Sequence, residues 1–207
     1  MDTIKKQEML DAVIQIEWDM FQHTENIGGR ASCQDDPETF YIMRVSQYAN
    51  WTDEMLECWF GFVKQCEQDG RNLVAEKYGR MMQYTDLHYY NKHIKPYIPF
   101  VPVKHYRLMN TIVEALIGWE KEFAASYPRL SQVGRPITSE GDVSGFTSME
   151  TYARGELETY PYELLELYAA YVKQLQEQNL NLSMLNQQTM VQFYGYDTIE
   201  EAEASLK

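Results

Sequence analysis

The chain has 207 residues, 44% of them hydrophobic, which is enough for a buried core in one or two small domains. Its formal net charge is −13, and its basic residues are scattered along the sequence. Because such a field repels a phosphate backbone, we expect no nucleic-acid partner.

Location and redox state follow from the same composition. Five carboxylates within the first 21 residues argue against the apolar region of a signal peptide. No apolar run approaches the roughly 20 residues that span a bilayer, so we expect a cytoplasmic protein without a membrane partner. Cys33, Cys58 and Cys66 are odd in number and form no C-x-x-C pair, which indicates neither a disulfide framework nor a zinc knuckle.

The first half of the sequence predicts four helices. A long helix runs through Phe21, and after a polar break a second helix is entered at Asp36, with Pro37 at its first position. The third helix carries an apolar stripe at Leu56, Trp59, Phe60, Val63 and Cys66. Gly70 ends it, because glycine readily takes the left-handed conformation of a helix C-terminus, and a fourth helix follows over about 71–84.

A connector separates the two halves. Pro96, Pro99 and Pro102 lie close together, and proline removes an amide donor and interrupts helices. We therefore interpret residues 96–103 as a proline-rich connector.

The second half begins with a helix through Trp119 and Phe123, followed by a long polar loop. Thr147 and Glu150 have the spacing of a capping box, which opens the next helix. This order of elements parallels the order in the first half.

A long segment of the first half then returns. EMLECWFGFVKQCEQDGRNL, from Glu54, becomes ELLELYAAYVKQLQEQNLNL, from Glu163, at a constant offset of 109 residues. The second copy has Asn179 where the first has its glycine stop, and asparagine also tolerates the left-handed conformation. PETF at Pro37 and METY at Met149 extend the correspondence at an offset of 112.

The chain ends in two further predicted helices. One covers about 182–194 and stops at Gly195. Asp197 and Glu200 then have the spacing of a capping box for a short final helix.

The duplication predicts an all-α fold. We expect a tandem pair of four-helix units, about 1–95 and 104–207, packed with pseudo-twofold symmetry into one domain over residues 1–207, with a short C-terminal helix. The stripes of both copies should be buried, at Leu56, Trp59, Val63, Leu165, Tyr168 and Val172.

Several motifs resemble those of one bacterial family. They are EWDMF (17–21), Asn26, GGRASCQDD (28–36), MRVSQ (43–47), GRPI from Gly134 and ETYARGE from Glu150. With these residues the chain resembles a domain of unknown function, number 4125, over nearly its whole length. The resemblance implies a shared fold and assigns no activity, cofactor or catalytic residue.

The loop after the first helix is the first candidate site. Gly28 and Gly29 allow a tight turn or a close approach to a ligand, and Arg30 offers a planar donor fork that suits an anion. Further hydrogen-bonding side chains come from Asn26, Ser32 and Gln34. The alternative is structural: Arg30 is held by Glu17 or Asp35 in a buried ion pair, and the glycines only turn the chain.

Cys33 is the candidate catalytic residue, because a thiolate near a helix start and an arginine is stabilised as a nucleophile. The alternative is a small buried hydrophobe, as free cysteine commonly is.

The remaining candidate ligands are Arg44, Arg135 and Arg154, which with Arg30 would converge on an acidic ligand between the repeats. The alternative is that buried arginines pair with acids and join helices. No E-x-x-H pair indicates a metal site. The alternative is a site between carboxylates of the two repeats, such as Glu17 and Glu120, if these meet across the pseudo-twofold axis. We name no metal ligand and no cofactor.

Two classes of function remain open. The first is a cytoplasmic protein that binds a small anionic ligand between its repeats, either as an enzyme or without catalysis. The second is a helical interaction or regulatory module that binds a protein partner without catalysis. Long loops rich in glycine, arginine and polar side chains favour the first.

Overall fold

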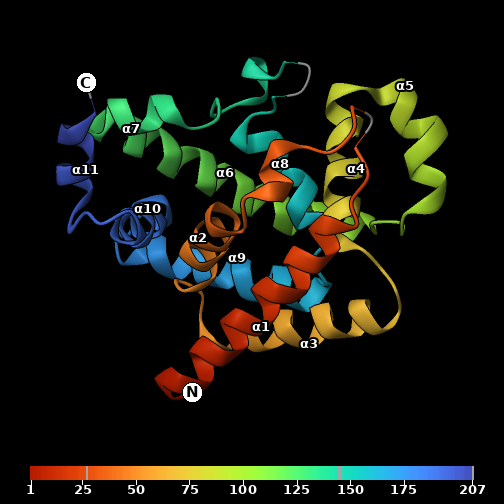
Figure 1. Cartoon of the computed structure of the whole chain (residues 1–207), viewed down its shortest axis with the longest axis horizontal. Coiled ribbons are helices and arrows are strands. Elements are labelled where there is room, and N and C mark those ends of the chain that lie inside the picture. Colours follow the sequence, from red (N-terminus) through yellow and green to blue (C-terminus); the bar gives the residue numbers. More distant parts are fainter. Residues whose placement is uncertain (27, 144–145, 207) are drawn as a thin grey trace.

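The computed structural model describes residues 1–26, 28–143 and 146–206. Within these ranges the regular elements are helical, and the only strand-like feature is one isolated bridge between Val143 and Phe146. The all-α prediction is therefore confirmed (Figure 1). None of the helices in these ranges combines the length and apolarity needed to cross a membrane.

The α-helices are, in chain order, α1 (Thr3–Gln22), α2 (Pro37–Tyr48), α3 (Asp53–Gln68), α4 (Leu73–Thr85), α5 (Leu87–Tyr89), α6 (Val103–Ser126), α7 (Pro128–Val133), α8 (Met149–Leu157), α9 (Tyr162–Glu177), α10 (Leu182–Phe193) and α11 (Ile199–Ser205). The short 3-10 turns are η1 (Ser32–Asp35), η3 (Lys95–Tyr97) and η4 (Ser139–Gly141), and a π-helical segment, η2, covers Tyr90–Ile94.

The duplicated segments form matching helices. α3 and α9 each have 16 residues, and each is followed by a left-handed residue, Gly70 at φ 68° and Asn179 at φ 53°. In both copies the next amide donates back into the helix at 2.8 Å, from Arg71 to Cys66 and from Leu180 to Leu175. The predicted helix ends are confirmed.

The next helices also begin alike. Asn72 caps α4 and Asn181 caps α10, each by accepting a backbone amide three residues on. The side-chain amide of Asn72 donates to Met20 O on α1, and that of Asn181 donates to Trp119 O on α6. One asparagine in each half therefore fixes the first helix of its own half to the duplicated hairpin.

Two helices pack across the boundary between the halves. α1 packs on α3 and α6 on α9 within each half, whereas α4 packs on α8 and α10 packs on α2 across the halves. α3 also contacts α9, so the two duplicated helices meet (Figure 1). This pairing agrees with a pseudo-twofold arrangement, and superposition of the two repeats stays a prediction.

This packing across the halves produces one shared core. All six stripe residues that we expected to be buried are buried, between 0% and 4% exposed. They belong to a single apolar cluster that includes side chains from both halves. A small second cluster, formed by Phe123, Val191, Ile199 and Ala202, lies under α11.

Two predicted caps are shifted by one residue. The cap of α8 is Ser148, whose hydroxyl accepts from Thr151 N, and not Thr147. Glu150 does not reach back to the cap, because its carboxylate accepts from Ser139 N of the preceding loop. The cap of α11 is likewise Thr198 and not Asp197.

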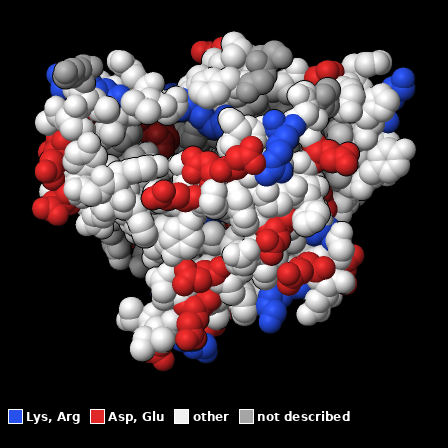
Figure 2. Space-filling view, in the orientation of Figure 1, with Lys and Arg blue, Asp and Glu red and all other residues white. Residues whose placement is uncertain are grey.

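The charged side chains of this protein are mainly acidic. Figure 2 shows acidic side chains spread across the visible face and basic side chains in smaller groups, as the net charge of −13 requires. An anion approaching the protein therefore needs a local concentration of positive charge.

Candidate functional site: a cleft between the two halves

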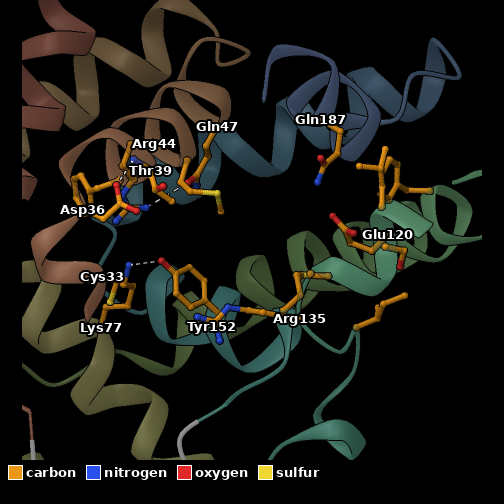
Figure 3. A pocket seen from close by; sticks show the side chains of 18 of the residues that line it. Cys33, Asp36, Thr39, Arg44, Gln47, Lys77, Glu120, Arg135, Tyr152 and Gln187 are labelled. Atoms are coloured by element: carbon orange, nitrogen blue, oxygen red, sulfur yellow. Dashed lines mark hydrogen bonds between the residues drawn. The ribbon is translucent and has the colours of Figure 1, made fainter. Parts of the chain in front are cut away.

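A cleft of about 410 Å³ lies between the halves. Its lining comes from α1, η1, α2 and α4 of the first half and from α6, α7, α8, α10 and the loop after α7 of the second. The polar residues labelled in Figure 3 are Cys33, Asp36, Thr39, Arg44, Gln47, Lys77, Glu120, Arg135, Tyr152 and Gln187. The rest of the lining is largely apolar, with Phe21, Phe40, Met43, Phe123, Leu130, Ile137 and Met149.

A buried ion cluster forms one end of the cleft. Arg44 on α2 contacts Glu17 on α1, with Nε 2.9 Å from Oε2, and donates from Nη1 to Glu156 Oε1 on α8 at 2.6 Å. All three side chains are buried. Arg44 and Glu156 are 112 residues apart, which is the offset between PETF and METY. Corresponding positions of the two repeats therefore meet as an ion pair.

Hydroxyl and indole groups complete this cluster. Tyr48 OH donates to Glu17 at 2.6 Å, Trp59 Nε1 donates to the same oxygen at 3.1 Å, and Tyr160 OH donates to Glu156 at 3.2 Å. Burial raises the pKa of Glu17, although Arg44 opposes the rise. Burial acts in the same direction on Glu156, but Arg44 and Lys77 outweigh it and hold the pKa of that carboxyl below its usual value.

Lys77 and Tyr152 lie beside this cluster and face the cleft. Lys77 Nζ on α4 donates to Tyr152 OH on α8 at 2.7 Å and lies 4.4 Å from the centroid of the tyrosine ring (Figure 3). Burial and the positive charge of Arg44 lower the pKa of Lys77, whereas desolvation raises the pKa of Tyr152 to about 12. At neutral pH the tyrosine therefore keeps its proton.

Arg135 is the exposed cation of the cleft. It follows Gly134 at the end of α7, and its Nη1 donates to the backbone and the hydroxyl oxygens of Thr147 at 2.8 and 3.2 Å. The guanidinium also lies 4.9 Å from the ring centroid of Tyr152. Within the described part of the chain no carboxylate lies within 4 Å of it, and its charge interacts with Asp142 only over a longer distance. The guanidinium therefore has room for an ion pair with a ligand.

Glu120 on α6 and Gln187 on α10 project into the other end of the cleft (Figure 3). Burial raises the pKa of Glu120, and a hydrogen bond with Ser183 opposes the rise. The cleft therefore has a cationic end and a carboxyl end, separated by apolar side chains.

The GGRASCQDD loop is held by its own side chains. Gln34 is 2% exposed and donates to Phe21 O and Thr24 O, while its side-chain oxygen accepts from Asn26 and from Ala31 N. Gly29 turns the chain at φ 87°. The structure therefore places Asn26 and Gln34 in the bracing of the loop, outside the cleft lining.

Arg30 and Arg154 are both paired with acids near them in sequence. Arg30 lies 2.8 Å from Asp35, as one of our structural alternatives expected, but the pair is exposed and not buried. Arg154 lies 3.1 Å from Glu150 and donates to Asn110 at 2.9 Å. These two arginines, with Gly28, Gly29 and Ser32, are not among the cleft-lining residues.

Three predicted site residues do line the cleft: Cys33, Arg44 and Arg135. Cys33 is exposed, so the alternative of a buried small hydrophobe is wrong for this cysteine, and its catalytic role stays a prediction. Arg44 is committed to Glu17 and Glu156, which matches the structural alternative for buried arginines.

Sequence reasoning missed Lys77 and Tyr152, and it considered Glu120 only as a metal ligand. One signal was available for Lys77: at the offset of 109 the second copy has Asn186, so only one copy places a charge at this position. Among the described residues no three His, Cys, Asp or Glu side chains are grouped as a metal would need, and Glu17 contacts Arg44.

Fold and site together define an all-helical protein with a polar-ended cleft between its halves. A family model described as "Protein of unknown function (DUF4125)" matches residues 7–204, and the chain belongs to this family. No curated protein and no solved structure gave a significant match.

Proposed function

We propose that the protein binds a small organic acid in the cleft between its halves. The ligand's carboxylate would meet Arg135, and its body would lie along the apolar lining toward Glu120 and Gln187. The observation that supports this most strongly is the difference between the ion pairs of the two arginines that line the cleft. Arg44 is neutralised by two buried carboxylates, whereas Arg135 lines the cleft, forms no ion pair within 4 Å among the described residues, and interacts with the charge of Asp142 only over a longer distance.

The surrounding charge favours selectivity for such a ligand at this place. The chain carries a net charge of −13, so anions are repelled over most of the surface. An arginine fork beside a tyrosine ring offers both charge-assisted hydrogen bonds and an apolar contact. The cysteines are free, with Cys33 exposed, which fits the reducing cytoplasm in which we place this protein.

A thermal-shift screen with matched ligands tests the proposal. We expect phenylacetate to raise the melting temperature in a saturable way and the neutral amide phenylacetamide to have little effect, since only the acid can pair with Arg135. In Arg135→Gln the affinity for phenylacetate should fall about tenfold to hundredfold, the cost of a charged hydrogen bond.

Arg107→Gln is the control for loss of one positive charge, because Arg107 is exposed on α6 and does not line the cleft. It should bind phenylacetate as the wild type does. Equal losses in Arg135→Gln and Arg107→Gln would contradict the site. If organic acids of every body size left the melting temperature unchanged, the interaction-module alternative would take precedence.

A further inference from the structure

Lys77 is a buried amine with too few acceptors for an ammonium group. It is 3% exposed, and among the described residues its one hydrogen-bond acceptor is Tyr152 OH at 2.7 Å. An ammonium has three N–H donors. The nearest carboxylate oxygen, Glu156 Oε2, lies 3.9 Å away, and the other oxygen of that carboxylate already accepts from Arg44. Hydrogen bonds therefore satisfy only part of an ammonium group here, while Glu156 and the ring faces of Tyr78 and Tyr152 act in favour of its charge.

Burial and a neighbouring cation also act on the Lys77 amine. Burial disfavours the charged form of Lys77, and the guanidinium of Arg44 in the same cluster adds repulsion, so the pKa of the amine is lowered. A lowered pKa increases the fraction of neutral amine, and the neutral amine is the form that attacks a carbonyl carbon.

Arg135 and Lys77 lie against the same aromatic ring. The guanidinium carbon is 4.9 Å and the amine nitrogen 4.4 Å from the ring centroid of Tyr152, and both residues line the cleft. A ligand whose carboxylate pairs with Arg135 would bring an adjacent carbonyl group to the part of the cleft that Lys77 borders. Tyr152 OH lies 2.7 Å from the amine nitrogen and would be close to the oxygen of a carbonyl group that the amine attacks.

We propose that Lys77 forms an imine with the carbonyl carbon of a 2-oxo acid bound in the cleft. This inference rests on the proposed function and names its ligand class. The amine nitrogen attacks the carbonyl carbon, a C–N bond forms, and the electron pair of the C=O π bond moves to oxygen. That oxygen takes the proton of Tyr152 OH, and the nitrogen returns a proton to the phenolate, which leaves a carbinolamine.

Loss of water completes the step. Tyr152 again protonates the oxygen, the C–O bond breaks as water leaves, and the second nitrogen proton returns to the phenolate. The balance is one amine and one carbonyl compound giving one imine and one water, without an oxidant or reductant. The Tyr152 hydroxyl is protonated at neutral pH, since desolvation raises its pKa to about 12, and it can therefore donate the proton in both steps.

Reductive trapping tests the inference directly. The wild-type protein is incubated with pyruvate or phenylpyruvate and sodium cyanoborohydride, then analysed by intact mass and peptide mapping. We expect one adduct, with the mass of the probe less one oxygen atom, on the peptide that contains Lys77. Because the modified residue is read in the wild-type protein, no lysine variant has to fold.

Variants and competition add a readout of mechanism. Tyr152→Phe should slow trapping about a hundredfold, as expected for loss of a general acid–base group. Lys64→Arg, at an exposed lysine on α3, should leave trapping at the wild-type rate. Excess phenylacetate, which has no ketone, should protect Lys77 by occupying the cleft.

The outcomes separate this inference from the proposed function. If phenylacetate binds through Arg135 but neither oxo acid labels Lys77, the imine is excluded and acid binding stands. Labelling spread over exposed lysines, unaffected by Tyr152→Phe or phenylacetate, also overturns the inference. Failure of phenylacetate and both oxo acids to bind overturns both.

Discussion

Arg44 joins three helices through two buried carboxylates. It extends from α2 to Glu17 on α1 and to Glu156 on α8. Such a charge is tolerated in a core only when it is paired and hydrogen-bonded, because isolated burial costs many kcal/mol. Tyr48, Trp59 and Tyr160 supply the remaining donors to the carboxylates.

Arg44→Met should therefore be strongly destabilising. The substitution leaves two buried carboxylates without their cation, and we expect the free energy of unfolding to fall by about 3–5 kcal/mol. Denaturant melts measure this loss. Lys173→Met, which breaks the exposed pair with Glu177, is the control and should change stability by less than about 1 kcal/mol. A loss at Arg44 as small as that at Lys173 would refute the buried cluster.

Glu120 should make stability depend on pH. Burial raises its pKa above the ordinary 4.5, so the folded chain holds this proton where the unfolded chain has released it. The contribution of Glu120 to the free energy of unfolding is fully present below its pKa in the unfolded chain. It is lost as the pH rises through its pKa in the folded chain. Glu120→Gln should thus raise the melting temperature relative to wild type near pH 7, but not near pH 4, where both side chains are neutral.

The control for this pH effect is Glu114→Gln, at an exposed position on the same helix. It reports the effect of removing one carboxylate from an acidic chain. An equal gain for both variants near pH 7 would assign the effect to net charge and not to burial of Glu120.

Residue roles were only partly predictable from the sequence. Arg44 and Arg135 were identified as candidates because arginine suits anions, but the sequence could not tell which one is neutralised. The reason is physical: the partner of Arg44, Glu156, is 112 residues away and meets it only through tertiary packing. Arg30 and Arg154, by contrast, pair with Asp35 and Glu150, which lie close in sequence.

At the level of elements, local signals determined what was predicted well. The stops at Gly70 and Asn179 depend on residues within one turn, and the two matching segments display this signal twice. The caps at Asn72 and Asn181 are equally local but were not predicted. α7 and the π-helical segment η2 were not predicted. The packing of α4 on α8 and of α10 on α2, across the two halves, was not predicted either, because it depends on the contacts of whole helices.

Two glycines in one region should respond in opposite ways to alanine. Gly70→Ala should cost about 1 kcal/mol, because an L-residue is strained at a φ of 68° although a Cβ would meet no atom within 4 Å. Gly61→Ala, on the open face of α3, should gain about 0.5–1 kcal/mol from helix propensity. Denaturant melts of both variants measure these changes. No loss of stability at Gly70 would contradict the assigned helix end, and a loss at Gly61 would contradict its place on an open helix face.

For the whole molecule, the packing of helices across the two halves explains where the cleft lies. α4 and α8 bring Lys77 to Tyr152, while α2 and α10 bring Gln47 and Gln187 to the same space. Each half alone lacks one side of this lining. The sequence predicted that a ligand would lie between the repeats, and that expectation stays a prediction until binding is measured.

Cys33 offers the most direct measurement of ligand position, because it is exposed and lines the cleft, whereas burial raises the pKa of Cys58 and Cys66. The rate of Cys33 alkylation by iodoacetamide is measured in the native protein with and without saturating phenylacetate. We expect the acid to slow alkylation of Cys33, phenylacetamide to leave the rate unchanged, and Arg135→Gln to abolish the protection. An unchanged Cys33 rate at an acid concentration that raises the melting temperature would contradict binding in the cleft.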